Sequence, residues 1–399
     1  MRGAALLLLL LAAAAPAQPP EAPAAASLPP PPDDGVLRMR WPATYQMNRS
    51  TCTFPDGNHS GFDNAARAAV TARYGLVTLG WQARICLNSR PSSDPAAPCA
   101  NAEAEAGLDE QAVRLKQLSP DTRVLVYRNT ELGMSSFGQQ CDKMYDPRYA
   151  GYWLRDARTG RPFNDPAHAT QFGPCLPSQN LSALRQDQFF RDFRNASSAA
   201  DFVGSVVGAV ARSPSVDGVW FDDTSGCCVE HANLTKQFTT AELAAIRNAT
   251  AAALLDAERT LVAAGKWSDH LFATIPRVVK AGNHCISAMQ GGAALGAAHI
   301  PGHMLIRYDP CPGCVPPYAN STDAFLRHLA SFLIGRGDFS WMGHSWIGTK
   351  PPLWYREWDL DYGLPLGPMT REGNVFARRF THVDVRICCD SLEYDFAWR

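Results

Sequence analysis

The strongest constraint on the fold is the order of segments along the chain, in which a helix pattern repeatedly precedes a short β-rich run. Segments such as "GLDEQAVRLKQLSPDT" and "SSAADFVGSVVGAVARSPSV", the second with a serine as its expected cap, show helical spacing and lead into β-rich runs. The β-rich runs lie at residues 74–80, 124–128, 218–222, 271–275, 303–308 and 339–342, and a longer run, "NVFARRFTHVDVRIC", lies near the end of the chain. This alternation predicts βαβ units and a parallel sheet.

Parallel βαβ units form either an open doubly wound sheet or a closed barrel. No glycine-rich G-x-G-x-x-G or Walker-type turn follows any of the β-rich runs, whereas polar and acidic residues follow several of them. We therefore predict an α/β fold, a (β/α)8 TIM barrel with long disulfide-bearing loops. Residues 36–399 suit one such domain, because a barrel with long loops takes about 250 to 400 residues.

The first 35 residues predict export. Residues 1–17 contain Arg2, an unbroken Leu/Ala run and an Ala-Pro-Ala cleavage pattern, which together indicate a secretory signal peptide. The apolar run is shorter than the roughly 20 residues that span a bilayer. An uncleaved signal anchor is the alternative. Residues 18–35 are rich in Pro and Ala and predict a flexible leader. We expect a secreted, extracellular protein.

Cysteines and glycosylation sequons agree with export. An even number of cysteines in an oxidising compartment favours disulfides. The alternative is a zinc site built from Cys311 and Cys314, which have C-x-x-C spacing, together with the pair Cys227 and Cys228, although this second pair lacks ligand spacing. The 12 cysteines are Cys52, Cys86, Cys99, Cys141, Cys175, Cys227, Cys228, Cys285, Cys311, Cys314, Cys388 and Cys389. N-x-S/T sequons occur at Asn48, Asn58, Asn180, Asn195, Asn233, Asn248 and Asn320, and predict a glycoprotein.

An acidic pair follows the apolar run of "DGVWFDD". In a parallel barrel the strand is buried along its length, so Asp222 and Asp223 mark the point where it emerges on the functional face. Side chains alternate along a strand, so only one of the two is expected to point into the barrel. Asp217 precedes the strand and suits a cap or turn at the opposite end. The alternative for the pair is a turn followed by a helix N-cap.

A second carboxyl group follows the run "HMLIRYDP". Asp309 is expected at the same end of the sheet, although an Asp-Pro turn explains it equally well. Glycoside hydrolysis needs two carboxyl groups, about 5–5.5 Å apart for retention or about 6.5–9.5 Å for inversion. The predicted catalytic residues are therefore Asp222, Asp223 and Asp309, with one of the first two paired with the third.

Polar and aromatic side chains at other strand ends suggest substrate contacts. The face of a pyranose ring packs on aromatic rings, and its hydroxyls bond to acids and amides. These residues serve equally well to pack loops onto a barrel. The candidate substrate-binding residues are Arg128, Glu131, Trp341, His344, Trp346, Trp358 and Asp361. No G-x-S-x-G motif offers a serine nucleophile.

Three segments carry a resemblance to a known family. Together "DGVWFDD", "WDLDYGLPLGP" and "VFARRF" resemble a family of glycoside-hydrolase-like (β/α)8 barrels related to the α-amylase and α-galactosidase superfamilies. The resemblance covers roughly residues 74–385. It implies a carboxylate at the end of the fourth strand, Asp222 or Asp223, and in α-galactosidase-like relatives an acid at the end of the sixth, Asp309. "LFATIPRVVK" lacks the glutamate that amylase-like enzymes carry after the fifth strand.

Two classes of function follow from these residues. The first is a secreted glycoside hydrolase with a carbohydrate substrate, and the alternative is a non-catalytic, glycan-binding or structural extracellular barrel. A formal net charge of −1 gives no sign of a nucleic-acid partner or of an anionic membrane partner. No residue pattern requires a metal or another cofactor.

Overall fold

The computed structural model describes residues 42–44, 68–69, 71–80, 104–164, 187–224, 232–270, 274–275, 280–298, 306–308, 323–336, 340–344 and 355–399. The chain divides into two compact units, Met1–Leu37 and Arg38–Arg399, and every described residue belongs to the second. The predicted signal peptide and leader lie outside the described residues.

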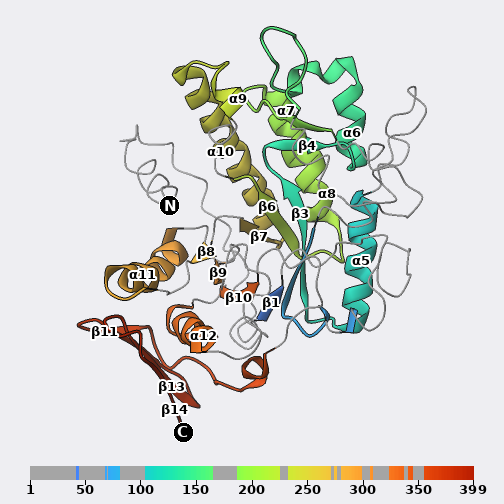
Figure 1. Ribbon diagram of the computed structural model, residues 1–399. Helices are drawn as coiled ribbons and strands as arrows, with labels where there is room; N and C mark the ends of the chain where they lie inside the picture. Colours follow the sequence, from blue (N-terminus) through green and yellow to red (C-terminus); the bar gives the residue numbers. More distant parts are fainter. Residues whose placement is uncertain are drawn as a thin grey trace, which may run out of the picture. The chain divides into compact units, whose positions relative to one another are not determined.

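A parallel sheet forms the centre of the second unit (Figure 1). Its eight described strands are ordered β7-β6-β3-β2-β1-β10-β9-β8. Their bounds are β1 Pro42–Thr44, β2 Leu76–Leu79, β3 Arg123–Asn129, β6 Gly218–Asp222, β7 Trp267–His270, β8 Thr274–Ile275, β9 Ile306–Tyr308 and β10 Ser340–His344. Followed from β1, the sheet order is the chain order, and β10 returns to pair with β1. This is the strand order of a (β/α)8 barrel.

The predicted barrel is confirmed in its parallel α/β architecture and strand order, but its closure is not. No ladder joins β7 to β8 among the described residues, so the sheet has two edges there. Only three residues separate Trp267–His270 from Thr274–Ile275, whereas a crossover between parallel strands needs about a dozen. The described residues therefore contain no helix between β7 and β8.

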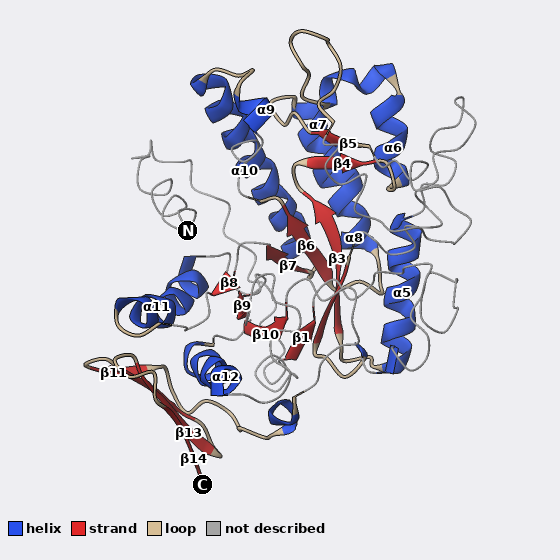
Figure 2. Cartoon of the chain, in the orientation of Figure 1, coloured by secondary structure: helices blue, strands red, loops and turns tan. Residues whose placement is uncertain are grey.

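Helices cover one face of the sheet, which we call the outer face (Figure 2). α5 (Ala104–Leu118) packs beside β3, and α10 (Thr240–Ala263) packs beside β7. α10 begins with a capping box, in which Oγ1 of Thr239 accepts from the Glu242 amide at 3.2 Å and the Glu242 carboxylate accepts from the Thr239 amide at 2.8 Å. Among the described helices, none combines the length and the apolar character that crossing a membrane would require.

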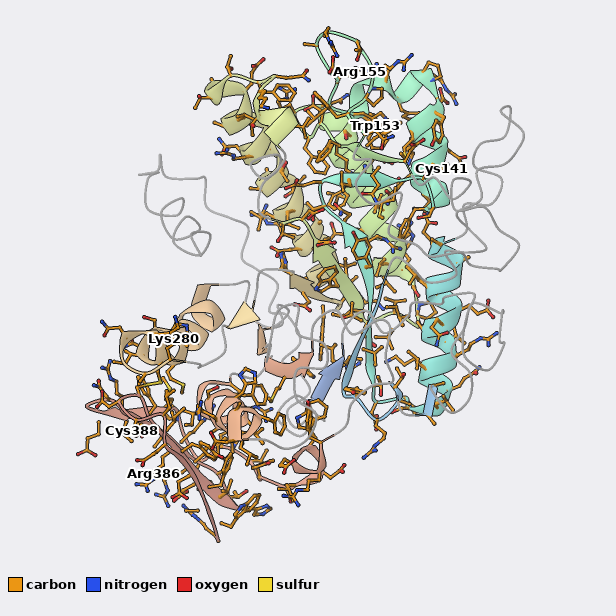
Figure 3. The ribbon with its side chains drawn as sticks, in the orientation of Figure 1. Cys141, Trp153, Arg155, Lys280, Arg386 and Cys388 are labelled. Carbon is orange, nitrogen blue, oxygen red and sulfur yellow. A yellow bond between two sulfur atoms is a disulfide. The ribbon has the colours of Figure 1, made fainter. Side chains whose placement is uncertain are left out.

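A long insertion separates β3 from β6. It contains the antiparallel pair β4 (Leu132–Met134) and β5 (Gln188–Phe190), the helix α6 (Gly138–Tyr145) and the 3-10 helix η1 (Pro147–Tyr152). Cys141 and Trp153 lie in this insertion (Figure 3). Cys141 is disulfide-bonded.

The insertion ends in a helical rod that returns the chain to β6. The rod consists of α7 (Ala196–Asp201), a π-helical segment η4 (Phe202–Val207) and α8 (Gly208–Arg212). Its N-cap is Asn195, whose side chain accepts from the Ser197 amide at 2.9 Å, and not the predicted serine. Asparagine caps helices at least as well as serine, and Asn195 stands one residue before the helix begins.

The end of the chain forms a separate antiparallel sheet, of β11 (Thr370–Glu372), β12 (Val375–Arg379), β13 (Val383–Cys388) and β14 (Tyr394–Trp398). The predicted single run "NVFARRFTHVDVRIC" is therefore wrong, because it folds as the two paired strands β12 and β13. The turn between them contains no glycine or asparagine, so the sequence lacked the usual signal. This sheet packs on α12 (Asp323–Gly335).

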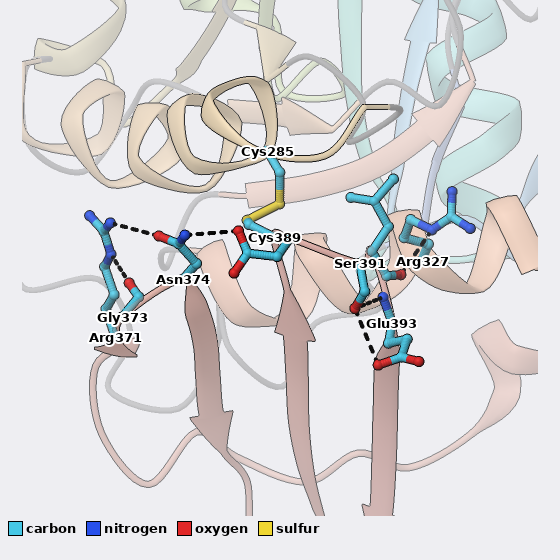
Figure 4. Close-up of a disulfide and its surroundings, with 10 residues drawn as sticks. Cys285, Arg327, Arg371, Gly373, Asn374, Cys389, Ser391 and Glu393 are labelled. Carbon is cyan, nitrogen blue, oxygen red and sulfur yellow. Dashed lines mark hydrogen bonds between the residues drawn. A yellow bond between two sulfur atoms is a disulfide. The ribbon is translucent and has the colours of Figure 1, made fainter.

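A disulfide ties this sheet to a helix. Cys285 of α11 (Asn283–Ala298) is bonded to Cys389, directly after β13 (Figure 4). It joins a helix to a strand end, so the predicted disulfides between long loops are not confirmed. The four cysteines of the zinc alternative, Cys227, Cys228, Cys311 and Cys314, lie outside the described residues.

Candidate functional site

The end of β6 shows which way its acidic pair points. Phe221 lies on the outer face, where its ring is 6.4 Å from that of Phe202 in η4. Trp220 lies on the opposite face, which we call the inner face, with its ring 5.5 Å from that of Tyr127 in β3. Since side chains alternate along a strand, Asp222 shares the inner face with Trp220. It is 8% exposed.

Asp223 departs from the alternation on which the sequence prediction relied. Its φ of 48° lies in the left-handed region, which aspartate adopts more readily than most residues other than glycine. The backbone therefore turns back after the strand, and the Asp223 carboxylate accepts a hydrogen bond at 2.8 Å from Nδ2 of Asn129. Asn129 is the register partner of Asp222. The expectation that only one of the two carboxylates points inward is therefore wrong.

Asn129, the last residue of β3, holds this arrangement. Its Oδ1 accepts from the backbone amides of Glu131 at 3.0 Å and Leu132 at 2.8 Å. Because the amide oxygen is engaged there, the amide nitrogen must face the other way. It donates to Asp223 and, at 2.9 Å, to the hydroxyl of Tyr127. The backbone after β3 thus orients the side chain that contacts the acidic pair.

Tyr127 supplies a hydroxyl group that stays protonated. Burial, together with the charges of Asp222 and Asp223, raises the pKa of its phenol well above the usual value of 10. The hydroxyl oxygen accepts from Asn129, so its own proton is free for the Asp222 side chain, to which it is hydrogen-bonded. The inner face at the carboxyl ends of β3 and β6 therefore contains two carboxylates, one phenol and one amide in mutual contact.

A third acidic residue lies on the same face. Asp269 of β7 is the register partner of Trp220 and is fully buried. Its Oδ1 accepts from the His270 amide at 2.8 Å. Asp269 lies level with Trp220, two residues nearer the amino end of the sheet than Asp222. We call Asp222, Asp223, Asp269, Tyr127 and Asn129 the acidic cluster of the inner face.

Arg128 and Glu131, both predicted to bind substrate, have different surroundings. Arg128 points to the outer face, where its guanidinium lies over the ring of Phe137 at 5.2 Å and donates to the Tyr127 carbonyl at 2.7 Å. Burial lowers the pKa of this guanidinium to about 10. The structure therefore places Arg128 away from the acidic cluster. Glu131 is buried directly after β3, where its carbonyl accepts from the Arg191 amide at 2.8 Å.

Trp341 and Trp358, two predicted aromatic contacts, are core residues. Trp341 of β10 is fully buried, with its ring 5.3 Å from that of Trp267, the first residue of β7. Trp358 packs on Tyr74, which precedes β2, with ring centroids 5.9 Å apart. Both lie toward the amino ends of strands, whereas the acidic cluster lies at the carboxyl ends. The predicted role as substrate contacts is therefore not supported for these two residues. A sequence does not distinguish an aromatic residue that packs in the core from one that binds a sugar.

The remaining predicted residues lie away from the acidic cluster or outside the description. Asp361 is exposed beside the C-terminal sheet, and its carboxylate lies 3.2 Å from Nδ1 of His382. Asp309 and Trp346 lie outside the described residues. His344 ends β10, but its side chain is also outside the description.

The sequence prediction missed Tyr127 and Asp269 and did not commit to Asn129. Tyr127 and Asn129 were visible in principle, because they occupy alternate positions of a strand that precedes the acidic one. Asp269 belongs to "WSDH", which was not assigned to a strand. Each of these residues acts through its register with β6, which no local pattern reveals.

One family model matches part of the chain. Residues 317–384 match a family described as hypothetical glycosyl hydrolase family 15. The matched segment contains "DYGLPLG" and "VFARRF", so the resemblance to glycoside-hydrolase-like proteins is confirmed there. Asp222, Asp223 and Asp309 lie outside it. No curated protein sequence matches this chain.

Solved structures of glycoside hydrolases are similar to this chain. The GH36 α-galactosidase AgaA from Geobacillus stearothermophilus is 12% identical, with a TM-score of 0.45, over 88% of this chain and 47% of its own. The α-N-acetylgalactosaminidase NagBb from Bifidobacterium bifidum, in its quadruple mutant, is 10% identical, with a TM-score of 0.40, over 91% and 58%.

A third similar structure belongs to another glycoside hydrolase family. The GH31 dextranase FjDex31A from Flavobacterium johnsoniae, complexed with glucose, is 12% identical, with a TM-score of 0.44, over 78% of this chain and 37% of its own. The chain thus spans between 37% and 58% of the length of these three structures.

Proposed function

From the family match at residues 317–384 and the paired carboxylates at the end of β6, we propose that this protein is a glycoside hydrolase. The observation that carries the proposal is the convergence of Asp222 and Asp223 on Asn129 and Tyr127. Glycosidases use carboxyl groups presented in this way at the carboxyl ends of parallel strands. The sheet closes, in this proposal, as a (β/α)8-type barrel.

The two carboxylates have different roles in the proposed mechanism. Asp222 lies on the inner face and accepts a hydrogen bond from the Tyr127 hydroxyl, so it is the carboxylate that acts on the anomeric carbon or on the attacking water. Asp223 accepts from Asn129 and is more exposed than Asp222, so it contacts substrate hydroxyls. Asp309, which follows β9, is the proposed acid that protonates the leaving oxygen.

The test is hydrolysis of aryl α- and β-glycosides and of polysaccharides by the full chain. Asp222→Asn and Asp309→Asn are each expected to lower kcat/KM by about 10³-fold or more, and Asp223→Asn to raise KM more than it lowers kcat. Each variant must keep the wild-type Tm. Asp256→Asn, on the exposed surface of α10, is the matched control.

Two results would contradict the proposal. Full activity in Asp222→Asn would show that the acidic cluster is not the catalytic centre. No turnover of any substrate by the wild-type chain, with glycan binding intact in all the variants, would favour the non-catalytic glycan-binding barrel.

We also propose that the protein is secreted after cleavage near residue 17 and carries N-linked glycans. The disulfide between Cys285 and Cys389 supports an oxidising compartment. Expression in a secreting eukaryotic host tests this proposal. The N-terminal residue of the protein in the medium is expected near Gln18, and endoglycosidase treatment is expected to lower its mass. Retention in the membrane fraction would favour the signal anchor.

A further inference from the structure

A polar pocket of about 450 Å³ lies in the insertion between β3 and β6. Its walls come from α6, η1, η4 and α8, of which α8 packs beside β6. A volume of this size falls within the range of small-molecule sites, about 300 to 1,000 Å³. None of the residues of the acidic cluster lines it, so it is distinct from the proposed catalytic site.

The π-helical segment shapes one wall of this pocket. Six residues, Phe202–Val207, take the wider π geometry between two α-helical segments, and such segments occur frequently at functional sites. Gly204 and Ser205 of this segment line the pocket. A Cβ atom added to Gly204 would meet nothing within 4 Å. The glycine is therefore not required by packing, and its missing side chain leaves the wall open.

Two basic side chains at the pocket form ion pairs with neighbouring carboxylates, which neutralise their charge. Lys143 forms an ion pair with Asp201, the residue before η4. Arg148 forms one with Asp146, whose carboxylate also accepts from the Arg148 amide at 2.9 Å. These groups build the walls and offer little further binding capacity.

Other polar side chains at the pocket are not used by the fold. The side chains of Gln139, Asp142, Ser205 and Arg212 form no hydrogen bond or ion pair with the part of the chain that the structure describes. They offer donors and acceptors of both signs around one concave surface. Tyr149 adds an aromatic ring, which packs edge-to-face with the ring of Tyr152 at a centroid distance of 5.1 Å.

We propose that this pocket is a carbohydrate-binding site remote from the catalytic centre, which takes a segment of an oligosaccharide or polysaccharide. A sugar ring presents an apolar face for Tyr149 and hydroxyls that both donate and accept, which suits amide, carboxylate, guanidinium and hydroxyl groups together. An apolar ligand would leave these groups desolvated without partners. The proposal does not depend on catalysis, because binding at this site needs none of the acidic cluster.

The experiment measures binding of the full chain to dextran, galactomannan and hyaluronan by affinity gel electrophoresis. The wild-type chain is expected to be retarded in at least one of these gels. Gly204→Phe adds a ring to the pocket wall at a position where a Cβ atom meets nothing within 4 Å, and Arg212→Ala and Asp142→Ala remove two polar groups of the pocket. Each is expected to raise the dissociation constant by about tenfold or more. Arg259→Ala, on the exposed surface of α10, is the matched control for Arg212→Ala.

The outcomes separate this site from the catalytic one. The pocket variants are expected to hydrolyse small aryl glycosides at the wild-type rate, and Asp222→Asn is expected to keep its retardation in the gel. Retardation only by hyaluronan identifies an acidic sugar as the occupant, and retardation only by the other two identifies a neutral one. Equal retardation of the wild type and all three pocket variants, or no retardation of the wild type in any gel, overturns the proposal.

Discussion

At the residue scale, the position of Asp223 depends on one backbone angle. Its positive φ brings a second carboxylate to the inner face, where strand alternation alone would have turned it outward. Asn129 then holds that carboxylate and the Tyr127 hydroxyl with a single amide group. The chemistry proposed for Asp222 therefore depends on neighbours that do not themselves react.

Asn129→Asp tests the role of this amide. The new carboxylate still accepts from the Glu131 and Leu132 amides, but it replaces the donor that faces Asp223 with an acceptor of the same charge. We expect kcat/KM for aryl glycosides to fall by about 10- to 100-fold, the range for loss of a hydrogen bond to a charged group.

A matched control exists in the insertion. Asn164 has the same pattern, since its Oδ1 accepts from the Gln188 amide at 3.0 Å and its Nδ2 donates to Asp187 at 2.7 Å. Asn164→Asp is expected to leave kcat/KM unchanged. Equal losses in both variants would mean that the Asn129 effect is one of stability and not of position.

The raised pKa of the Tyr127 phenol predicts that the protein loses stability at alkaline pH. Its pKa is raised in the folded protein, so its contribution to stability is complete below the unfolded pKa of about 10 and is lost as the pH rises above it. The pH window that tests this, about 9 to 11.5, brackets the unfolded pKa of about 10. Across it, the Tm of Tyr127→Phe should decline less steeply than the Tm of the wild type. Tyr145→Phe, at a partly exposed tyrosine, is the control. Parallel curves for Tyr127→Phe and the wild type would contradict the prediction.

At the element scale, caps and cross-links stabilise helices whose sequence pattern alone is ordinary. α10 has many alanines, on its exposed side as well as its buried one, and its start is set by the Thr239–Glu242 capping box. α11 is attached to the C-terminal sheet by the disulfide of Cys285. Each feature can be removed without changing the packed face of its helix.

Thr239→Ala removes the cap of α10. The Glu242 amide then loses its acceptor, and the free energy of unfolding is expected to fall by about 1 kcal/mol, the usual cost of a lost N-cap. Urea denaturation followed by circular dichroism measures the change. Thr240→Ala, one residue further along at an exposed position, should change it by less than about half as much. A reversed order would show that the capping box is not formed.

Removing the disulfide loosens the C-terminal sheet. The bond closes a loop with a sequence separation of 104, for which the loss of unfolded-state entropy corresponds to about 4 to 5 kcal/mol of stability. The double variant Cys285→Ser and Cys389→Ser is expected to lower the free energy of unfolding by up to this amount. Cys388→Ser, at the unpaired neighbour, should have little effect. No change in the double variant under oxidising conditions would contradict the pairing.

At the scale of the whole molecule, the C-terminal sheet covers the helix α12. The apolar side of α12 contains Phe325, Leu329 and Phe332, all fully buried, and the C-terminal strands β12 to β14 pack against this helix. Arg327 also donates to the Leu392 carbonyl at 3.2 Å. The C-terminal sheet therefore helps to bury α12.

Deletion of residues 364–399 is expected to prevent stable folding. It would expose α12 and remove the partner of Cys285, and burial of each large apolar side chain contributes about 1.5 to 3 kcal/mol. The truncated chain should lack a cooperative thermal transition in circular dichroism. A chain that lacks residues 1–35 is the control and should melt as the full chain does. A cooperative transition in the chain that lacks residues 364–399 would show that the C-terminal sheet is an independent module.

The sequence by itself determined the class of the fold, because hydrophobic periodicity is a local property that alternates visibly between helix and strand. It placed β6 at residues 218–222, where the structure has it. It also singled out the acidic pair at the end of β6, since carboxylates after an apolar run stand out in any sequence.

The tertiary structure decided what no local pattern contains. Strand register placed Asn129 beside Asp222, and a left-handed backbone angle placed Asp223 beside both. The same register put Arg128 on the outer face, and packing put Trp341 and Trp358 in the core. These positions depend on contacts between residues far apart in the chain, whose free energies are set only when the whole sheet has assembled.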